Sequence, residues 1–328
     1  MGKTITVVGG GTGTYVVLQG LKKYFSDLAV IVSMTDSGGS TGRLRDQLGV
    51  LPPGDLRQCL IALSEASNLW RQLFLYRFEK GDLAGHNFGN IFLSALEKVF
   101  GDYEEVVKIA SFVLKTKGEV IPVTFDKVHL CVEYQNGKVI KGEGNIDKNF
   151  DEKARIRRAY LEPEAKANPR ALQRINESDY IIIAPGDLYT SIIPVFLVKK
   201  IKEFFKNSKA KIVFILNLMT KSGQTTGYKA SDFLKDIFSY TGRVPNYIIV
   251  NNGKIPKDVL NWYEKNNEVP VINDLNKINF RGFVIKKDII DRKKINFSKE
   301  ERFIDPRVRS ILRHDSLKLA KILAKIIS

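Results

Sequence analysis

A glycine-rich turn stands near the start of the chain, at the point where a buried strand gives way to a helix. The segment Gly9–Thr14 follows the apolar run Lys3–Gly9 directly. Glycines in such a turn expose backbone N–H groups and let a phosphate approach the following helix. The fingerprint G-x-G-x-x-G is incomplete because Thr14 occupies its third glycine position, and close packing is an alternative reason for these glycines. We expect phosphate to contact Gly10, Gly11, Thr12 and Gly13.

The loop after the next buried strand, Ala29–Met34, combines an acid, small residues and an arginine in the sequence TDSGGSTGR. Successive backbone N–H groups beside an arginine favour an anion. The acid could instead bind ribose hydroxyls or form an Asx turn that caps the next helix. The expected ligand contacts in this loop are Asp36, Ser37, Gly38, Gly39, Ser40, Thr41 and Arg43. Two such loops facing one crevice predict a diphosphate or a nucleoside diphosphate. The P-loop motif G-x-x-x-x-G-K-[ST] is absent, which excludes a P-loop ATPase.

Asp55 allows two interpretations. It stands in PPGDLR, just before a helical run through Leu60 to Leu63, and could cap that helix. Alternatively, Asp55 and Asp36 converge on a Mg²⁺ that bridges phosphates, because this hard cation prefers carboxylate oxygens and water. The sequence leaves both interpretations open.

Two further loops carry groups suited to a polar ligand. His86 is flanked by glycine and asparagine in GHNFGN, which makes it a candidate for a hydrogen bond to a base, a sugar or a phosphate. The loop Pro185–Ser191 follows the apolar run Tyr180–Ala184 and again places glycine and hydroxyl groups before a helix. These loops would add to the same crevice.

The elements that must position these loops alternate between short apolar runs and helical patterns. This alternation predicts an α/β, Rossmann-like, doubly wound and mostly parallel sheet. Alternating runs around Gln135-Asn136-Gly137 predict a β-hairpin insertion at residues 119–161. Apolar residues at helical spacing predict a C-terminal helix at residues 316–327. No linker or repeat is visible, so residues 1–328 are expected to form one large domain.

Composition narrows the class of protein further. No apolar stretch approaches the ~18 residues that span a bilayer, and no secretory signal pattern is present. Cys59 and Cys131 stand alone in apolar surroundings, which indicates reduced core residues in a cytosolic protein. The net charge is +16, and the last 58 residues hold 15 basic against 7 acidic side chains. Anionic small ligands explain this excess better than nucleic acid, because aromatic and basic residues are not interleaved. A merely solvated, charged surface is the alternative explanation.

Several long motifs together resemble one family. In chain order they are GGGTGTY, TDSGGSTGRLR, PPGDLRQCLIALS, GHNFGNIFLSAL, APGDLYTSIIP, NLMTKSGQTTGY and LRHDS. They resemble the YvcK-like gluconeogenesis-factor family, whose superfamily includes CofD, the 2-phospho-L-lactate transferase of deazaflavin-cofactor biosynthesis. The resemblance implies a cytoplasmic, Rossmann-like protein that binds a UDP-sugar such as UDP-glucose or UDP-N-acetylglucosamine. It also implies a role in cell shape and wall morphogenesis, with no settled catalytic activity.

The resemblance assigns roles to individual residues. The family's Gly-His-Asn-x-Gly-Asn signature matches His86, Asn87 and Asn90 here. The family's UDP-sugar-binding arginine matches Arg313. The threonine that is phosphorylated in some members is replaced by Ser316, which becomes the candidate regulatory phosphosite. Asp187 stands where many relatives have serine, and its charge weakens a phosphate site at that loop.

Three functions follow as hypotheses, ranked in this order. The first is a UDP-sugar-binding regulatory protein, which could act on cell-wall synthesis proteins and form a homo-oligomer. The second is a phospholactate-type transferase, in which Asp36, Asp55 and Mg²⁺ hold the diphosphate. The third, a nucleic-acid-binding protein, rests on net charge alone.

Overall fold

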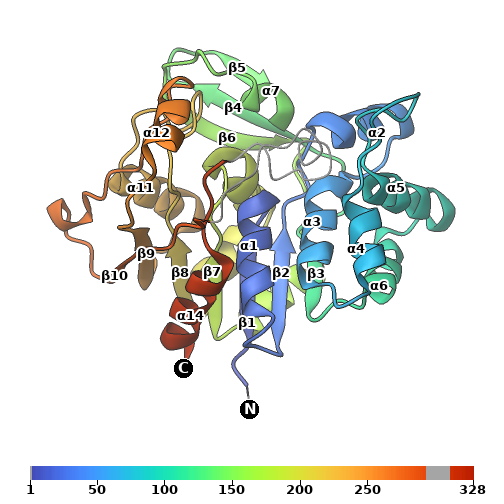
Figure 1. The fold of residues 1–328 in the computed structure, drawn as a ribbon, viewed down its shortest axis with the longest axis horizontal. Coiled ribbons are helices and arrows are strands. Elements are labelled where there is room, and N and C mark those ends of the chain that lie inside the picture. The colour runs from blue at the N-terminus through green and yellow to red at the C-terminus, as the bar shows by residue number, and fades with distance from the viewer. Residues whose placement is uncertain (1, 293–310) are drawn as a thin grey trace.

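The computed structural model describes residues 2–292 and 311–328, with a seven-stranded parallel sheet at its centre (Figure 1). The inner strands consist mostly of valine and isoleucine and are buried on both faces, as parallel sheets covered by helices require. The strands of this main sheet are β1 (Ile5–Gly9), β2 (Leu28–Val32), β3 (Glu119–Pro122), β7 (Tyr180–Ile183), β8 (Lys211–Ile215), β9 (Tyr247–Asn251) and β10 (Phe283–Lys287).

The strand order in the main sheet is β10-β9-β8-β7-β1-β2-β3. β1 pairs in parallel with β2 on one side and with β7 on the other, so that Val7 lies opposite both Val30 and Ile182. The chain order reverses at β1, and loops at such a switch point diverge to leave a crevice at the carboxyl ends of the strands. The predicted doubly wound α/β fold is confirmed.

Helices cover both faces of the main sheet. α1 (Gly11–Leu21), α3 (Pro53–Leu63) and α14 (Ser316–Ile327) lie side by side on the face nearer the viewer in Figure 1. α10 (Ile201–Asn207) packs against α8 (Pro169–Glu177), α9 (Ile193–Leu197) and α11 (Ala230–Thr241), and α9 also contacts α11. The predicted C-terminal helix begins and ends where expected, with Leu319 and Leu323 buried. The other α-helices away from the insertion are α2 (Gly39–Leu48), α4 (Asn68–Leu75), α5 (Phe88–Phe100), α6 (Tyr103–Leu114) and α12 (Lys257–Glu264).

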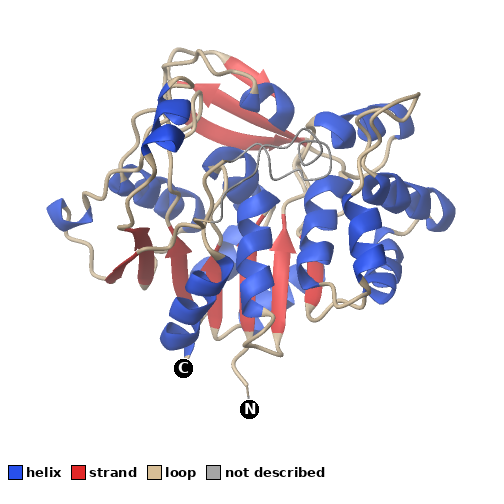
Figure 2. Ribbon diagram, in the orientation of Figure 1, coloured by secondary structure: helices blue, strands red, loops and turns tan. Residues whose placement is uncertain are grey.

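A small antiparallel sheet lies over the carboxyl edge of the main sheet, toward which the arrows in Figure 2 point. It consists of β4 (His129–Tyr134), β5 (Val139–Lys141) and β6 (Ile156–Glu162), and the short helix α7 (Glu143–Asp147) follows β5. The predicted hairpin insertion is confirmed. Its start shifts, however, because residues 119–122 pair in parallel with β2 and form β3 of the main sheet.

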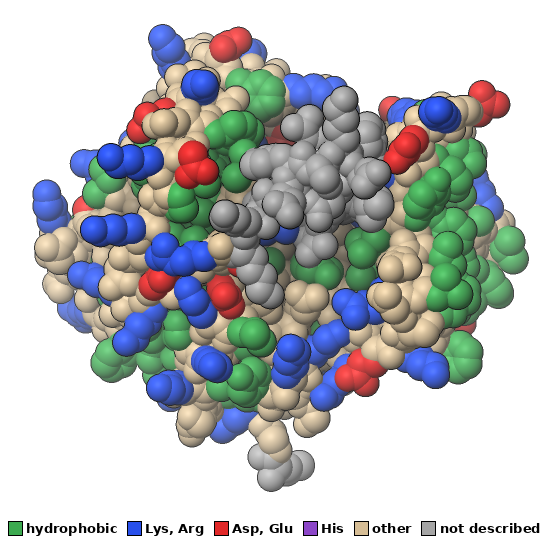
Figure 3. Space-filling model, viewed as in Figure 1, with side chains coloured by type: hydrophobic (Ala, Val, Ile, Leu, Met, Phe, Trp, Pro, Cys, Tyr) green, Lys and Arg blue, Asp and Glu red, His purple; other side chains and the backbone are tan. Residues whose placement is uncertain are grey.

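The face drawn in Figure 3 carries scattered charges and an apolar area. Lys and Arg side chains are spread over the face in Figure 3, whereas apolar side chains gather over α4 and α5 at the right. Leu69, Trp70 and Phe100 are among the exposed apolar residues there. In the described part of the chain, every helix is too short or too polar to cross a membrane. Both cysteines are buried and free, as predicted.

Candidate functional site

The turn between β1 and α1 is held from two sides. Gly11 has a φ of +66°, a conformation that favours glycine, and its N–H donates to Asp55 Oδ1 at 2.9 Å. Gly13 packs so closely on the loop after β7 that a Cβ built there would lie 1.7 Å from the carbonyl oxygen of Pro185. Packing therefore explains Gly13. In this structure the acceptor of the Gly11 N–H is a carboxylate.

Asp55 does not act as the N-cap that one interpretation predicted. α3 begins at Pro53 with Pro52 as its N-cap, so Asp55 lies within the first turn of the helix. Its carboxylate is buried and crosses to the Gly11 turn instead of bonding to its own helix. Asp36 lies against the same turn of α3, because a Cβ at Gly54 would lie 2.1 Å from Asp36 Oδ2. Asp36 and Asp55 thus come together, as the second interpretation predicted.

The loop between β2 and α2 is an Asx turn closed by the insertion. Asp36 Oδ1 accepts from the Gly38 N–H at 2.9 Å. This hydrogen bond forms an Asx turn, which is one of the alternatives that the sequence allowed for Asp36. The Ser37 N–H donates to Glu143 Oε2 at 3.2 Å, and the Gly144 N–H donates to Ser37 Oγ at 3.1 Å. The first turn of α7 therefore covers this loop, and a second candidate phosphate-binding N–H also has a carboxylate partner.

The GHNFGN loop packs against the β2–α2 loop through a buried polar network. Ser40 Oγ lies 3.2 Å from His86 Nδ1 and accepts from Asn90 Nδ2 at 3.3 Å. The Arg57 guanidinium donates to Asn90 Oδ1 at 2.7 Å and fixes that amide. Asn87 Oδ1 accepts from the Asn90 N–H, so Asn87 caps α5. These side chains hold the two loops together. Asn87 and Asn90 therefore have a structural role in addition to any contact with a ligand.

Arg43 and Thr41 complete this group. Arg43 is exposed, and its guanidinium donates to the carbonyl oxygen of Ala84 at 2.8 Å, beside the GHNFGN loop. Thr41 is buried next to Gly54, where a Cβ would lie 2.5 Å from Thr41 Oγ1. The structure thus gathers the residues predicted from the Gly9–Thr14 turn, the Asp36 loop, Asp55 and the GHNFGN loop at one edge of the sheet.

Five carboxyl groups form the acidic cluster of this crevice: Asp36, Asp55, Glu143, Asp147 and Asp187. Burial and then the charge of Asp36 raise the pKa of Asp55 to about 8. Burial and then Asp36 also raise the pKa of Glu143 well above its usual value. Burial and then Asp187 raise the pKa of Asp147 to about 6. The cluster therefore retains protons near neutral pH, and a cation bound among its oxygens would stabilise the ionised carboxylates.

Residues of the NLMTKSGQTTGY segment complete the far side of the cluster. Gln224 is buried, and its Nε2 donates to Asp147 Oδ1 at 2.7 Å. Burial alone would lower the pKa of Lys221, but the charges of Asp187, Glu268 and Asp147 outweigh burial and raise it. In the sequence, only the family resemblance pointed to this segment. A polar run directly after the strand Lys211–Ile215 is the signal that could have placed it at the carboxyl edge.

The acidic cluster suits Mg²⁺ as a partial set of ligands. Among residues 2–292 and 311–328, no group of three or more His, Cys, Asp or Glu side chains is arranged to hold a metal ion. Mg²⁺ commonly binds through one or two carboxylates and completes its shell with water and substrate phosphates. Asp36 and Asp55 supply carboxylates of this kind, with the Gly11 turn beside them.

Arg313 and Ser316 lie elsewhere. Arg313 precedes His314, whose Nε2 donates to the carbonyl oxygen of Leu216 at 3.2 Å beyond the end of β8. Ser316 starts α14 and packs on α1, because a Cβ at Gly20 would lie 3.0 Å from Ser316 Oγ. Gly20 is nine residues beyond Gly11, or about 13 Å along the helix. The Arg313 backbone therefore lies near the end of β8, and Ser316 lies away from the Gly-rich turn.

The comparison with family models defines the class to which this fold and site belong. The model described as 2-phospho-L-lactate transferase CofD matches residues 5–290. The chain is thus a Rossmann-like protein of the CofD group, with its polar loops at the carboxyl edge of a parallel sheet.

Individual relatives make the assignment more specific. The chain is 38% identical over 326 residues to the gluconeogenesis factor of Bacillus subtilis (strain 168), covering 98% of both chains. It is 39% identical over 300 residues to that of Halalkalibacterium halodurans, covering 88% of this chain and 92% of the relative. A UPF0052 family protein from Bacillus halodurans has a similar crystal structure, with a TM-score of 0.88, 36% identity and coverage of 98% and 99%. The chain belongs to the gluconeogenesis-factor family.

Proposed function

We propose that this chain is a cytoplasmic regulatory protein that binds a UDP-sugar and supports cell shape and wall synthesis during growth on gluconeogenic carbon sources. Membership of the gluconeogenesis-factor family supports a role in growth on gluconeogenic carbon sources. The observation that carries the binding activity is the convergence of the Gly11 turn, the Asp36 loop and the GHNFGN loop at the switch point of the sheet. Cell-wall synthesis proteins are the partners that this role requires.

The acidic cluster gives this proposal a requirement for a cation. A diphosphate that approaches the Gly11 and Ser37 N–H groups meets Asp55 and Glu143, which already accept from those donors. Repulsion between phosphate and carboxylate would oppose binding unless the carboxyl groups are protonated or a cation intervenes. Mg²⁺ held by Asp36 and Asp55 would neutralise the diphosphate. We therefore expect Mg²⁺ to strengthen UDP-sugar binding.

A second candidate function is a transferase of the CofD type. Its supporting observations are the CofD family match and the neighbouring carboxylates of Asp36 and Asp55, which suit a metal-bound diphosphate donor. In such a reaction an acceptor oxygen would attack the donor phosphorus and the nucleoside monophosphate would leave. We rank this function second because the full-length relatives cited above are named gluconeogenesis factors.

Calorimetric titration of the full chain with UDP-N-acetylglucosamine, UDP-glucose, GDP and NAD⁺ tests the proposal. We expect the UDP-sugars to bind at least tenfold more tightly than GDP or NAD⁺, and a chelator of Mg²⁺ to weaken that binding. Failure of both UDP-sugars to bind would contradict the proposal. Conversion of a nucleotide-activated phospholactate into a transferred product and nucleoside monophosphate would establish the transferase instead.

A further inference from the structure

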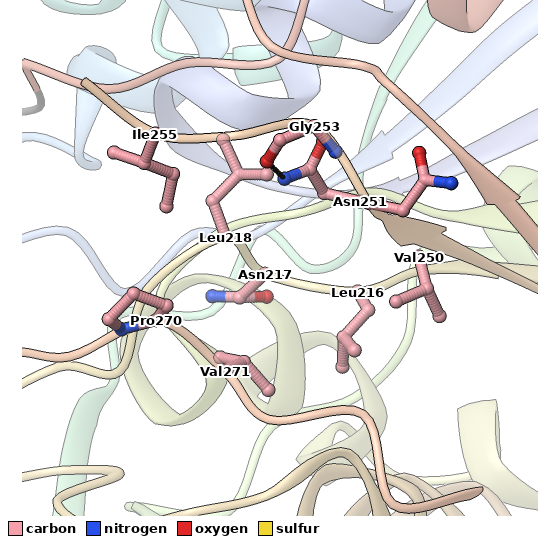
Figure 4. Close-up of a pocket in the computed structure, with 10 residues that line it drawn as sticks. Leu216, Asn217, Leu218, Val250, Asn251, Gly253, Ile255, Pro270 and Val271 are labelled. Atoms are coloured by element: carbon pink, nitrogen blue, oxygen red, sulfur yellow. Dashed lines mark hydrogen bonds between the residues drawn. The ribbon is translucent and has the colours of Figure 1, made fainter. Parts of the chain in front are cut away.

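A separate pocket lies beyond the acidic cluster, over the carboxyl ends of β8 and β9. It encloses about 260 Å³, which is just under the roughly 300 Å³ at which pockets for drug-sized ligands begin. Figure 4 shows apolar side chains around this hollow and the Asn217 amide among them. Its apolar wall is formed by Leu216, Leu218, Val250, Ile255, Pro270 and Val271. The lining residues carry no charged side chain, so the pocket suits a flat, uncharged ring and part of an attached sugar.

The two asparagines that follow β8 and end β9 differ in what they can offer a ligand. Both amide atoms of Asn251 are bonded within the wall: its Nδ2 donates to the Gly253 carbonyl at 2.9 Å, and its Oδ1 accepts from the N–H groups of Gly253 and Ile289. Asn217 Nδ2 donates to the Gly186 carbonyl at 2.6 Å, which fixes the orientation of the amide. Asn217 Oδ1 is buried and has no hydrogen-bond partner in the described part of the chain. A ligand N–H that reached it would remove this cost.

The walls of the pocket contact the rest of the site on two sides. Gly186, which accepts from Asn217, packs on the Gly-rich turn, because a Cβ there would lie 3.6 Å from the Gly10 carbonyl oxygen. On the other side, Leu216 accepts from His314, the residue after Arg313. Burial lowers the pKa of His314 to about 4, so this imidazole is neutral near pH 7 and its contact is a structural one. The pocket therefore lies between the phosphate-facing turn and the Arg313 segment.

We propose that this pocket binds the base of the nucleotide and selects uracil through its N3–H, which donates to Asn217 Oδ1. The inference rests on the proposed nucleotide-binding function and adds the place and the chemistry of base recognition. A single pyrimidine ring fits the volume, and six apolar residues form part of the wall around it. A base without a ring N–H leaves Asn217 Oδ1 unpaired and binds more weakly.

Two ligands that differ at one position test the hydrogen bond. UDP and 3-methyl-UDP are titrated into the full chain with Mg²⁺ present. We expect 3-methyl-UDP to bind at least tenfold more weakly, because the methyl group replaces the donated hydrogen. Equal affinities would overturn the proposal.

Substitutions at two neighbouring residues test whether the base binds in this pocket. Val271→Phe fills the pocket, whereas Ile272→Phe makes a similar change at a side chain that is 59% exposed. We expect Val271→Phe to weaken UDP binding at least tenfold and Ile272→Phe to leave it unchanged, with melting temperatures verifying the fold of each. If Val271→Phe does not fold, Ile255→Phe, on the loop after β9, replaces it.

The outcomes separate this inference from the proposed function. Binding of UDP that survives Val271→Phe, or Ile255→Phe in its place, overturns the base pocket and leaves UDP-sugar binding intact. A wild-type chain that binds neither UDP nor UDP-N-acetylglucosamine contradicts both.

Discussion

The two sides of the switch point are built on opposite principles. On the β1–β2 side, buried carboxylates already hold the N–H groups of Gly11 and Ser37, and loops pack so closely that Gly13 has no room for a side chain. On the β8–β9 side, an uncharged pocket of about 260 Å³ is open beside Asn217. The first side therefore supplies charged and polar groups in close packing, and the pocket on the second side is lined by uncharged side chains. A nucleoside diphosphate needs both, which is the reason for placing its phosphates and its base on different sides.

The largest expected effect tests how closely the β1 side is packed. Gly13→Ala would place a Cβ 1.7 Å from the Pro185 carbonyl oxygen, so the helix and the loop must separate. We expect a loss of stability of about 3 kcal/mol or more, measured by urea denaturation. Gly186→Ala is the matched control across the same junction, because its nearest neighbour would be Ser191 Cβ at 3.3 Å. Similar losses for the two variants would contradict the packing account.

The next prediction concerns the cation on the β8 side. Arg313→Ala should weaken UDP-sugar binding by about 10- to 150-fold, the range for losing a charge-assisted hydrogen bond. Lys325→Ala, on the exposed side of α14, is the control for net charge. Calorimetry measures the affinities and thermal unfolding verifies the fold. An Arg313→Ala protein with normal affinity and reduced stability would make Arg313 a structural residue of the β8–β10 edge.

Asp55→Asn tests the carboxylate side through pH. Because the folded-state pKa of Asp55 is raised to about 8, the folded state binds its proton more tightly than the unfolded state does, and stability falls as pH rises from about 4 to 8. Asparagine keeps an acceptor for the Gly11 N–H and removes the charge. We expect the variant to be more stable than wild type at pH 8, on the order of 2 kcal/mol, and much closer to it at pH 5. An equal difference at the two pH values would show that Asp55 does not carry this titration.

The number of protons exchanged when ligand binds also tests the carboxylate side of the site. Mg²⁺ and a UDP-sugar together should release protons from the acidic cluster, because a cation lowers the pKa values of Asp55 and Asp147. UDP-sugar without Mg²⁺ should take protons up. Titrations in two buffers of different ionisation enthalpy give the number of protons exchanged. The same sign with and without Mg²⁺ would remove the metal from this site.

The smallest expected effect is that of Ser316. A negative charge at the start of α14 attracts the Arg313 guanidinium, so Ser316→Glu should weaken UDP-sugar binding by about threefold. Ser316→Gln is the neutral control of similar size. If the glutamate and glutamine variants bind equally well, phosphorylation of Ser316 does not act through Arg313.

Much of the fold follows from local sequence signals. Continuous runs of valine and isoleucine, separated by amphipathic patterns, predicted the parallel sheet, and residues 316–327 formed the expected helix. Apolar residues at helical spacing also run through residues 192–207, but the structure divides this segment. A π-helix at Leu188–Ile192 precedes α9 and α10, and Lys200 has a φ of +71° between them. Apolar spacing alone does not reveal such breaks.

The candidate site was predicted less completely than the fold. The loops after β1 and β2 and the pairing of Asp36 with Asp55 follow from the rule that strand ends meet at one edge. Glu143 and Asp147 were missed because they enter from the insertion, more than 100 residues beyond the Asp36 loop that they cover. Their placement depends on how the small sheet docks, which is a tertiary effect. Asn217 was missed because a single asparagine after a strand carries little information by itself.

A crystal structure of the full chain with UDP-N-acetylglucosamine and Mn²⁺ in place of Mg²⁺ tests the central claim most directly. The division of the site predicts the uracil ring in the β8–β9 pocket, with N3 within hydrogen-bond distance of Asn217 Oδ1. It also predicts an anomalous Mn²⁺ peak between the diphosphate and the carboxylates of Asp36 and Asp55. A uracil ring bound over the Asp36 loop, with the β8–β9 pocket empty, would contradict it.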